Sequence, residues 1–193
     1  MTYYDIVKQA LSHLEYGTDE DSVATFIDRF MSYANDAVRK IAIGLKMEMV
    51  RNVQVEDGEF LVNELYENET PPIIATKIVE VFKDDICYPF IQGSYDEKVQ
   101  VLAKDGVYRV RFRYVPDYES DPTQTPSIPA LFHPIIYLYI AHCHYNTRST
   151  ASDYDRTKWL QEFEQERKRL TRQAYSVLNT MAWKNRPWET GEM

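Results

Sequence analysis

The chain has 193 residues, which is enough for a domain that buries a core without disulfide or metal support. Hydrophobic residues make up 44% of it and charged residues 27%, and only 6 glycines occur, which excludes collagen-like, linker-like and wholly disordered proteins. The formal net charge is −8. Residues 1–121 hold 23 acidic and 13 basic side chains, so they lack the broad basic face that binding to a phosphate backbone requires.

Cysteine usage and hydropathy indicate a reducing, aqueous compartment. Cys87 and Cys143 each lie in an apolar run and form no CxxC pair, so we expect two buried free thiols. The N-terminal residues lack the basic region and apolar core of a signal peptide, and no run reaches the ~18 apolar residues of a membrane span. We therefore expect a protein that is cytosolic, or made in a cytosol and assembled there.

Helical periodicity dominates both ends of the sequence, where apolar residues recur at intervals of three and four. This spacing predicts four helices, over residues 2–16, 22–46, 130–147 and 152–178. Asp21 or Ser22 is placed to cap the second helix. The third is the most apolar of the four, so we expect it to be the buried central helix.

Between residues 52 and 116 the period changes to two, which predicts an inserted block of antiparallel strands. Asp57-Gly58 is typical of a hairpin turn. The best strand pair is expected at residues 98–104 and 107–115, on either side of Asp105-Gly106.

Two further segments complete the β block. Residues 73–82 are rich in β-branched side chains and predict a strand, whereas Pro89 places residues 86–91 at a sheet edge. The expected fold is therefore α+β, a helical bundle with an inserted antiparallel β block, a long C-terminal helix and an extended C-terminal tail. We expect one domain over residues 1–180 and the extended tail over residues 181–193.

The sequence offers no set of residues arranged for catalysis, metal binding or cofactor binding. On a regular helix His142 and His144 point about 200° apart, so they cannot share an ion. His133 lies nine residues before His142, which is ~13 Å along a helix axis. We expect these histidines to be core or interface residues, and we expect no enzyme activity, no metal and no cofactor.

A row of three arginines is the first candidate interaction site. Arg109, Arg111 and Arg113 alternate with apolar residues on the last predicted strand, so they share one face of a sheet. Such a row is usually solvated or paired with acidic side chains of a neighbour, but it can also meet phosphates. Contact with another subunit or with DNA is therefore a possible role of the row.

The C-terminal tail is the second candidate site, because it places large aromatic and cationic side chains outside the predicted helices. The residues concerned are Trp183, Lys184, Arg186, Pro187 and Trp188. Tryptophan and arginine contribute most of the binding free energy at many interfaces. We expect the segment to dock on a partner subunit, and a disordered end is the alternative.

Three parts of the sequence carry a resemblance to a known family. The first is the opening helix pair, in which Phe26-Ile27 leads into the run Tyr33–Ala42 with its Asn35. The second is the end of the β block, Val110–Pro116, and the third is Ile128–Ile136, where Ile-Pro precedes an apolar helix and then a charged one. In this order and spacing they resemble the head-to-tail adaptor proteins of tailed bacteriophages, also called connector or head-completion proteins.

The resemblance implies a structural virion protein that forms a ring, usually of twelve copies, beneath the portal, joins capsid to tail and lines the DNA channel. The implied location is the portal vertex or neck of the virion, after assembly in the cytoplasm of the bacterial host. The implied partners are the portal protein, further copies of the chain, a downstream tail or neck protein, and genome DNA that passes without sequence-specific binding. No membrane partner is implied. The resemblance also gives the Trp183–Trp188 segment a partner, because the family's C-terminal tail packs against the portal.

Other functions remain open on the sequence alone. The chain could be another neck or tail-completion protein, such as a stopper or a tail-side component. Outside phage it could be a cytosolic regulatory scaffold or a DNA-binding module. These alternatives differ in stoichiometry and partner, and a DNA-binding module would show salt-dependent affinity for duplex DNA.

Overall fold

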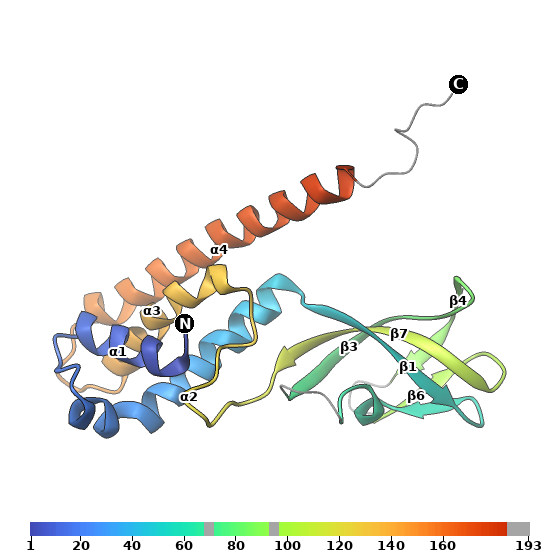
Figure 1. Ribbon diagram of the computed structural model, residues 1–193, viewed down its shortest axis with the longest axis horizontal. Coiled ribbons are helices and arrows are strands. Elements are labelled where there is room, and N and C mark those ends of the chain that lie inside the picture. Colours follow the sequence, from blue (N-terminus) through green and yellow to red (C-terminus); the bar gives the residue numbers. More distant parts are fainter. Residues whose placement is uncertain (68–71, 93–96, 185–193) are drawn as a thin grey trace. The chain divides into compact units, whose positions relative to one another are not determined.

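A computed structural model describes residues 1–67, 72–92 and 97–184, with side chains of the last helix described as far as Tyr175. The fold is α+β, as the sequence predicts. The chain divides into two compact units, which are labelled by their elements in Figure 1. The helical unit consists of residues 1–34 and the residues from 129 on, and the β unit consists of residues 35–128.

The first helix, α1 (Tyr3–His13), begins at a reciprocal cap. The hydroxyl of Thr2 accepts a hydrogen bond from the backbone N–H of Asp5 at 3.2 Å, and the Asp5 carboxylate accepts one from the N–H of Thr2 at 2.9 Å. These hydrogen bonds hold the pKa of Asp5 below its usual value. The apolar side of α1 is fully buried, as its periodicity predicts, at Ile6, Val7, Ala10 and Leu11.

Helix α2 (Glu20–Leu45) begins two residues earlier than predicted. Its cap is Asp19, whose carboxylate accepts a hydrogen bond from the backbone N–H of Ser22 at 3.0 Å. The prediction that Asp21 or Ser22 caps the helix is therefore wrong, because both already lie within its first turn. The predicted apolar stripe is confirmed over most of the helix, and its buried members include Val23, Phe30, Ala34, Ala37, Val38 and Ile41.

The predicted helix over residues 130–147 has two parts. A 3₁₀ helix, η2 (Ala130–Ile135), comes first, and α3 (Ile136–Asn146) follows it. Pro134 explains the division, because it has no N–H to donate and disfavours α-helical geometry at the residue before it. Ile136 and Ile140 are fully buried, which agrees with the prediction of a central helix.

The last helix, α4 (Asp153–Lys184), lies along α3 in the helical unit (Figure 1). Its Phe163 and Leu170 are buried, whereas Tyr154 in its first turn is exposed. The helix continues past residue 178, so residues 181–184, which were expected to begin the extended tail, are helical. No proline occurs between Asp153 and Lys184, and the first proline after the start of the helix is Pro187.

The β unit contains two antiparallel sheets. The larger has the order β1-β7-β3-β4, formed by β1 (Glu48–Val55), β7 (Gly106–Pro116), β3 (Ile73–Lys83) and β4 (Ile86–Tyr88). The smaller has the order β2-β6-β5, formed by β2 (Glu59–Leu61), β6 (Lys98–Val101) and β5 (Phe90–Gln92). A short 3₁₀ helix, η1 (Val62–Leu65), follows β2.

One buried cluster joins the two sheets and forms the core of the β unit. Tyr108, Val110 and Phe112 of β7 belong to it, together with Phe60 of β2 and Val99 of β6. The predicted alternation along β7 is therefore confirmed, because the arginines between these residues lie on the opposite face of the sheet.

The predicted pairing of residues 98–104 with 107–115 is wrong. Strand β6 pairs with β2 and β5, whereas β7 pairs with β1 and β3, so the chain passes from one sheet to the other at Asp105-Gly106. The Asp105 carboxylate accepts a hydrogen bond from the backbone N–H of Gly58, at 3.1 Å. Long-range pairing thus overrides the local preference for a hairpin.

The turn at Asp57-Gly58 forms as predicted, with positive φ of 52° and 76° at its two residues. Glu56 and Glu59 exchange backbone hydrogen bonds across it, at 3.0 and 2.9 Å. The strands on either side then separate, because β1 joins the larger sheet and β2 the smaller. The local prediction is therefore confirmed, but the turn connects two sheets instead of two strands of one sheet.

Pro89 separates β4 from β5, and each of these strands lies at the edge of its own sheet, as the proline predicts. The prediction of two buried thiols is wrong, and the edge position of β4 explains this for Cys87. Cys87 on the edge strand β4 is exposed, and Cys143 on α3 is partly buried. Both are free thiols, as expected.

Candidate interaction surfaces

The outer face of the larger sheet carries the arginine row. Strand β7 lies between β1 and β3, so each arginine has a neighbouring strand on both sides. The register places Arg113 opposite Glu48 of β1 and Arg111 opposite Glu80 of β3. Opposite charges at such cross-strand positions attract each other directly.

Each arginine of the row forms an ion pair within the sheet. Arg109 contacts Asp85 of the β3–β4 turn at 2.8 Å, and Arg113 contacts Glu48 at 3.2 Å. Arg111 contacts Glu80, and this hydrogen bond raises the pKa of Arg111, so the guanidinium stays charged. The guanidinium of Arg109 also lies over the ring of Phe82, 4.5 Å from its centroid.

The three pairs are partly exposed, so each contributes little to stability, at most about 1 kcal/mol. Their larger effect is on the charge of the surface. A phosphate that approached the row would compete with three carboxylates already in contact with the guanidinium groups. The sequence suggested pairing with acidic neighbours as one possibility, and the structure identifies them as side chains of the same sheet or its turn.

The competition between the carboxylates and a phosphate can be tested by removing the three carboxylates and keeping the arginines. The variant Glu48→Gln/Glu80→Gln/Asp85→Asn should bind duplex DNA at least about tenfold more tightly than the unmodified chain at low salt, because three guanidinium groups become available to phosphates. The gain in affinity should vanish at about 200 mM salt, as expected when binding releases counterions. Fluorescence anisotropy with a labelled duplex measures both effects.

The matched control makes the same change of net charge elsewhere in the β unit, as Glu56→Gln/Glu59→Gln/Glu64→Gln. The affinity of this control variant for DNA should stay much lower than that of the first variant. Equal gains in the two variants would mean that net charge, and not the arginine row, controls contact with DNA.

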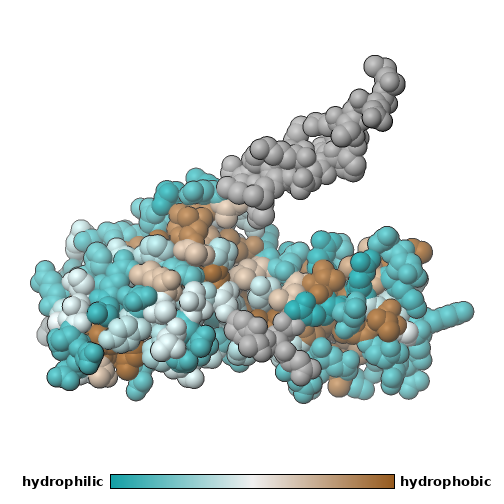
Figure 2. All heavy atoms as spheres, in the orientation of Figure 1, coloured by the Kyte–Doolittle hydropathy of each residue, from teal (hydrophilic) through white to brown (hydrophobic). Residues whose placement is uncertain are grey.

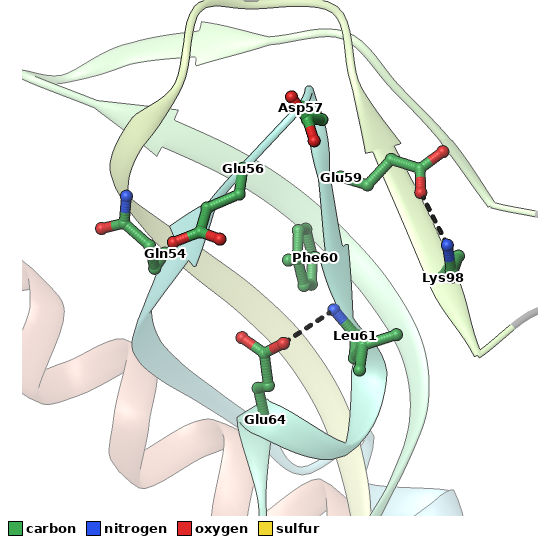
Figure 3. Close-up of a pocket in the computed structure, with 8 residues that line it drawn as sticks. All are labelled: Gln54, Glu56, Asp57, Glu59, Phe60, Leu61, Glu64 and Lys98. Atoms are coloured by element: carbon green, nitrogen blue, oxygen red, sulfur yellow. Dashed lines mark hydrogen bonds and ion pairs between the residues drawn. The ribbon is translucent and has the colours of Figure 1, made fainter.

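A hollow of about 400 Å³ lies at the start of β2 (Figure 3). Its lining residues are Gln54, Glu56, Asp57, Glu59, Phe60, Leu61, Glu64 and Lys98. Lys98 contacts Glu59 at 3.1 Å, and hydrogen bonds from Gln100 and Lys98 lower the pKa of Glu59. Four carboxylates against one ammonium give this surface a negative charge, which repels nucleic acid.

Neither feature forms a metal centre. In residues 1–67, 72–92 and 97–175, whose side chains are described, no group of three or more His, Cys, Asp or Glu side chains is arranged to hold a metal ion. Within the same ranges, no helix is long and apolar enough to cross a membrane. On the face drawn in Figure 2, hydrophilic residues predominate, and apolar residues lie among them on both units.

The C-terminal candidate site is described only in part. Trp183 and Lys184 are the last two residues of α4, and their side chains lie outside the described part of the chain. Arg186, Pro187 and Trp188 also lie outside the described residues.

Asn35 belongs to the run that carries the resemblance, and its structural role becomes visible only in the fold. Asn35 is 2% exposed. Its side-chain amide donates to the backbone oxygen of Glu119 at 2.8 Å and accepts from the backbone N–H of Glu119 at 3.0 Å. Asn35 therefore fixes the proline-containing connector after β7 to α2, a contact over 84 residues of sequence.

Two of the three histidines expected to be core or interface residues are buried. His133 and His144 are each 3% exposed, and His142 is partly buried. His142 contacts the backbone oxygen of Arg156 through Nδ1 at 2.8 Å. His144 lies between Tyr16 and Arg29, which brings together residues from the α1–α2 turn, α2 and α3.

Comparison with known proteins does not assign the chain. No family model matches the sequence, and no curated protein matches it either.

Proposed function

We propose that the chain is a head-to-tail adaptor of a tailed bacteriophage, a virion protein that forms a ring under the portal, joins capsid to tail and surrounds the path of the DNA. The observation that carries this proposal is the order of elements. Two helices precede a β insertion, and an apolar helix and a long charged helix follow it, with the resembling runs at α2, the end of β7 and η2.

The charge distribution supports a protein that DNA passes without binding. The arginine row is paired with Glu48, Glu80 and Asp85, and the hollow near β2 carries four carboxylates. Both features leave few cations available to phosphates, which suits a channel through which DNA moves. The excess of tyrosine, 15 residues, suits contacts repeated between neighbouring copies of a ring.

The direct test is mass photometry of the purified chain, alone and mixed with the portal ring of its virus. A discrete complex should form that is heavier than the portal by about twelve copies of a 22.8 kDa chain. The free chain can be a monomer or a ring, because docking can itself drive assembly. A folded chain that forms no complex with the portal would refute the proposal and favour a tail-side component.

The segment Trp183–Trp188 is proposed to bind the portal. The variant Trp183→Ala/Trp188→Ala should weaken portal binding by about tenfold or more, because buried tryptophans contribute strongly to interface free energy. Removal of residues 189–193 is the matched control, since it shortens the tail but keeps both tryptophans, and it should preserve binding. Equal affinities of the unmodified chain and the double variant would assign portal binding to another surface.

A further inference from the structure

His144 lies at the centre of a buried polar contact in the helical unit. Its Nε2 lies 3.2 Å from the hydroxyl oxygen of Tyr16, and its Nδ1 lies 3.5 Å from a terminal nitrogen of Arg29. The guanidinium of Arg148 donates a hydrogen bond to the same Tyr16 hydroxyl. We call Tyr16, Arg29, His144 and Arg148 the His144 cluster.

The neighbours of His144 fix its neutral form. A guanidinium can only donate, so Nδ1 of His144 must accept from Arg29, and the proton of the neutral ring lies on Nε2. That N–H then donates to the Tyr16 hydroxyl. The arrangement uses both ring nitrogens, and it requires that one of them carry no proton.

The groups that face His144 disfavour a positive charge on it. From the α1–α2 turn comes Tyr16, from α2 come Arg29 and the rings of Phe26 and Phe30, and from the residues after α3 comes Arg148. On α3 itself, the neighbouring ring is Tyr145. None of these groups carries a negative charge, and two of them are cations.

We propose that the His144 cluster is an acid-sensitive contact, which holds the α1–α2 turn against the C-terminal end of α3 and releases it when His144 gains a proton. A second proton on the ring would turn Nδ1 from an acceptor into a donor facing Arg29. It would also place a charge in a site that is 3% exposed and beside two guanidinium groups. Breaking the contact lets water reach the ring.

The pKa of His144 sets the pH range in which the contact is released. Burial, then Arg148 and Arg29, lowers the pKa of His144 from 6.5 to about 4. Because the folded-state pKa is the lower one, the unfolded chain binds the proton first, and stability is lost as pH falls from above 6.5 towards 4. At pH 5 the ratio of folded to unfolded chain should be roughly 30-fold lower than at pH 8 through this group alone.

The test compares the full chain with His144→Gln, which keeps a side-chain donor but cannot titrate in this range. Urea denaturation at pH 8 and pH 5, followed by tryptophan fluorescence, measures the helical unit, because all three tryptophans lie outside residues 35–128. Between pH 8 and pH 5, the factor by which the ratio of folded to unfolded chain falls should be roughly 30 times smaller in His144→Gln than in the unmodified chain. The matched control is His142→Gln, two residues away on α3, which should keep the full loss.

Hydrogen exchange locates the release. Between pH 8 and pH 5, after correction for the intrinsic exchange rate, protection should fall first at the α1–α2 turn and at the end of α3. It should stay unchanged there in His144→Gln. Equal pH dependence of His144→Gln and the unmodified chain, or loss of protection spread evenly over the helical unit, would overturn the proposal. If His144→Gln does not fold, ¹H–¹⁵N NMR of the ring in the unmodified chain decides, and a His144 pKa near 6.5 would overturn it.

Discussion

Replacing Phe112 with alanine should lower the free energy of unfolding of the β unit by about 3–5 kcal/mol. Phe112 is completely buried on β7, the strand that lies between β1 and β3. Its register partners are Met49 and Ile78. The cavity left by the missing ring therefore opens at the centre of the larger sheet, where neighbouring strands cannot collapse without breaking their ladders.

The same strand provides a control. Val107 is 55% exposed on β7, so Val107→Ala removes little buried surface and should change the free energy of unfolding by no more than about 0.5 kcal/mol. Urea denaturation followed by circular dichroism compares the two variants. If Phe112→Ala costs as little as Val107→Ala, the core of the β unit does not depend on β7.

The positions of the tryptophans allow the two units to be followed separately. Trp159 lies in α4, and residues 35–128 contain no tryptophan. In Phe112→Ala, hydrogen exchange in the strands should rise at a lower urea concentration than the one at which tryptophan fluorescence changes. A simultaneous change would mean that the helical unit and the β unit unfold as one cooperative system.

Periodicity predicted the local structure of this chain well. The stripe on α2 and the alternation of Val110 and Phe112 with arginines on β7 each place residues on one face by spacing alone. These features depend on neighbours within a few residues, so the sequence contains the information directly. The class of fold follows from the same features, because strands predicted between helices indicate an α+β protein.

Strand pairing could not be predicted in the same way. Asp105-Gly106 favours a hairpin locally, yet β7 pairs with β1, and Arg113 lies opposite Glu48 at a separation of 65 residues. Many registers would satisfy the alternation of β7, and only packing of the two sheets selects one. For the same reason, the sequence could not show that the arginine row is paired within its own sheet, or that Cys87 lies exposed on an edge strand.

Replacing Asn35 with alanine should lower the free energy of unfolding of the β unit by about 2–3 kcal/mol. The substitution removes two hydrogen bonds of a buried side chain and leaves the partly buried N–H and carbonyl of Glu119 without their side-chain partner. Cleavage of the connector 117–129 by a protease should become faster, because this contact ties the connector to α2. Urea denaturation and limited proteolysis measure the two effects.

Tyr118→Phe is the control for Asn35→Ala, since Tyr118 is the connector residue that directly precedes Glu119. It removes the hydrogen bond from the Tyr118 hydroxyl to Asp36 but keeps the ring that contacts Arg39. This side chain is 46% exposed, so the loss should be below about 1 kcal/mol. If the two variants lose equal free energies of unfolding, the burial of Asn35 does not increase its contribution to stability.

The Asn35 variant also separates a structural role from recognition of the portal. Asn35 is buried and its amide is already used, so it cannot reach a partner in the folded chain. At a temperature where Asn35→Ala is folded, it should therefore bind the portal ring as tightly as the unmodified chain. A folded variant that fails to bind would mean that the connector held by Asn35 forms part of the portal interface, in addition to the segment Trp183–Trp188.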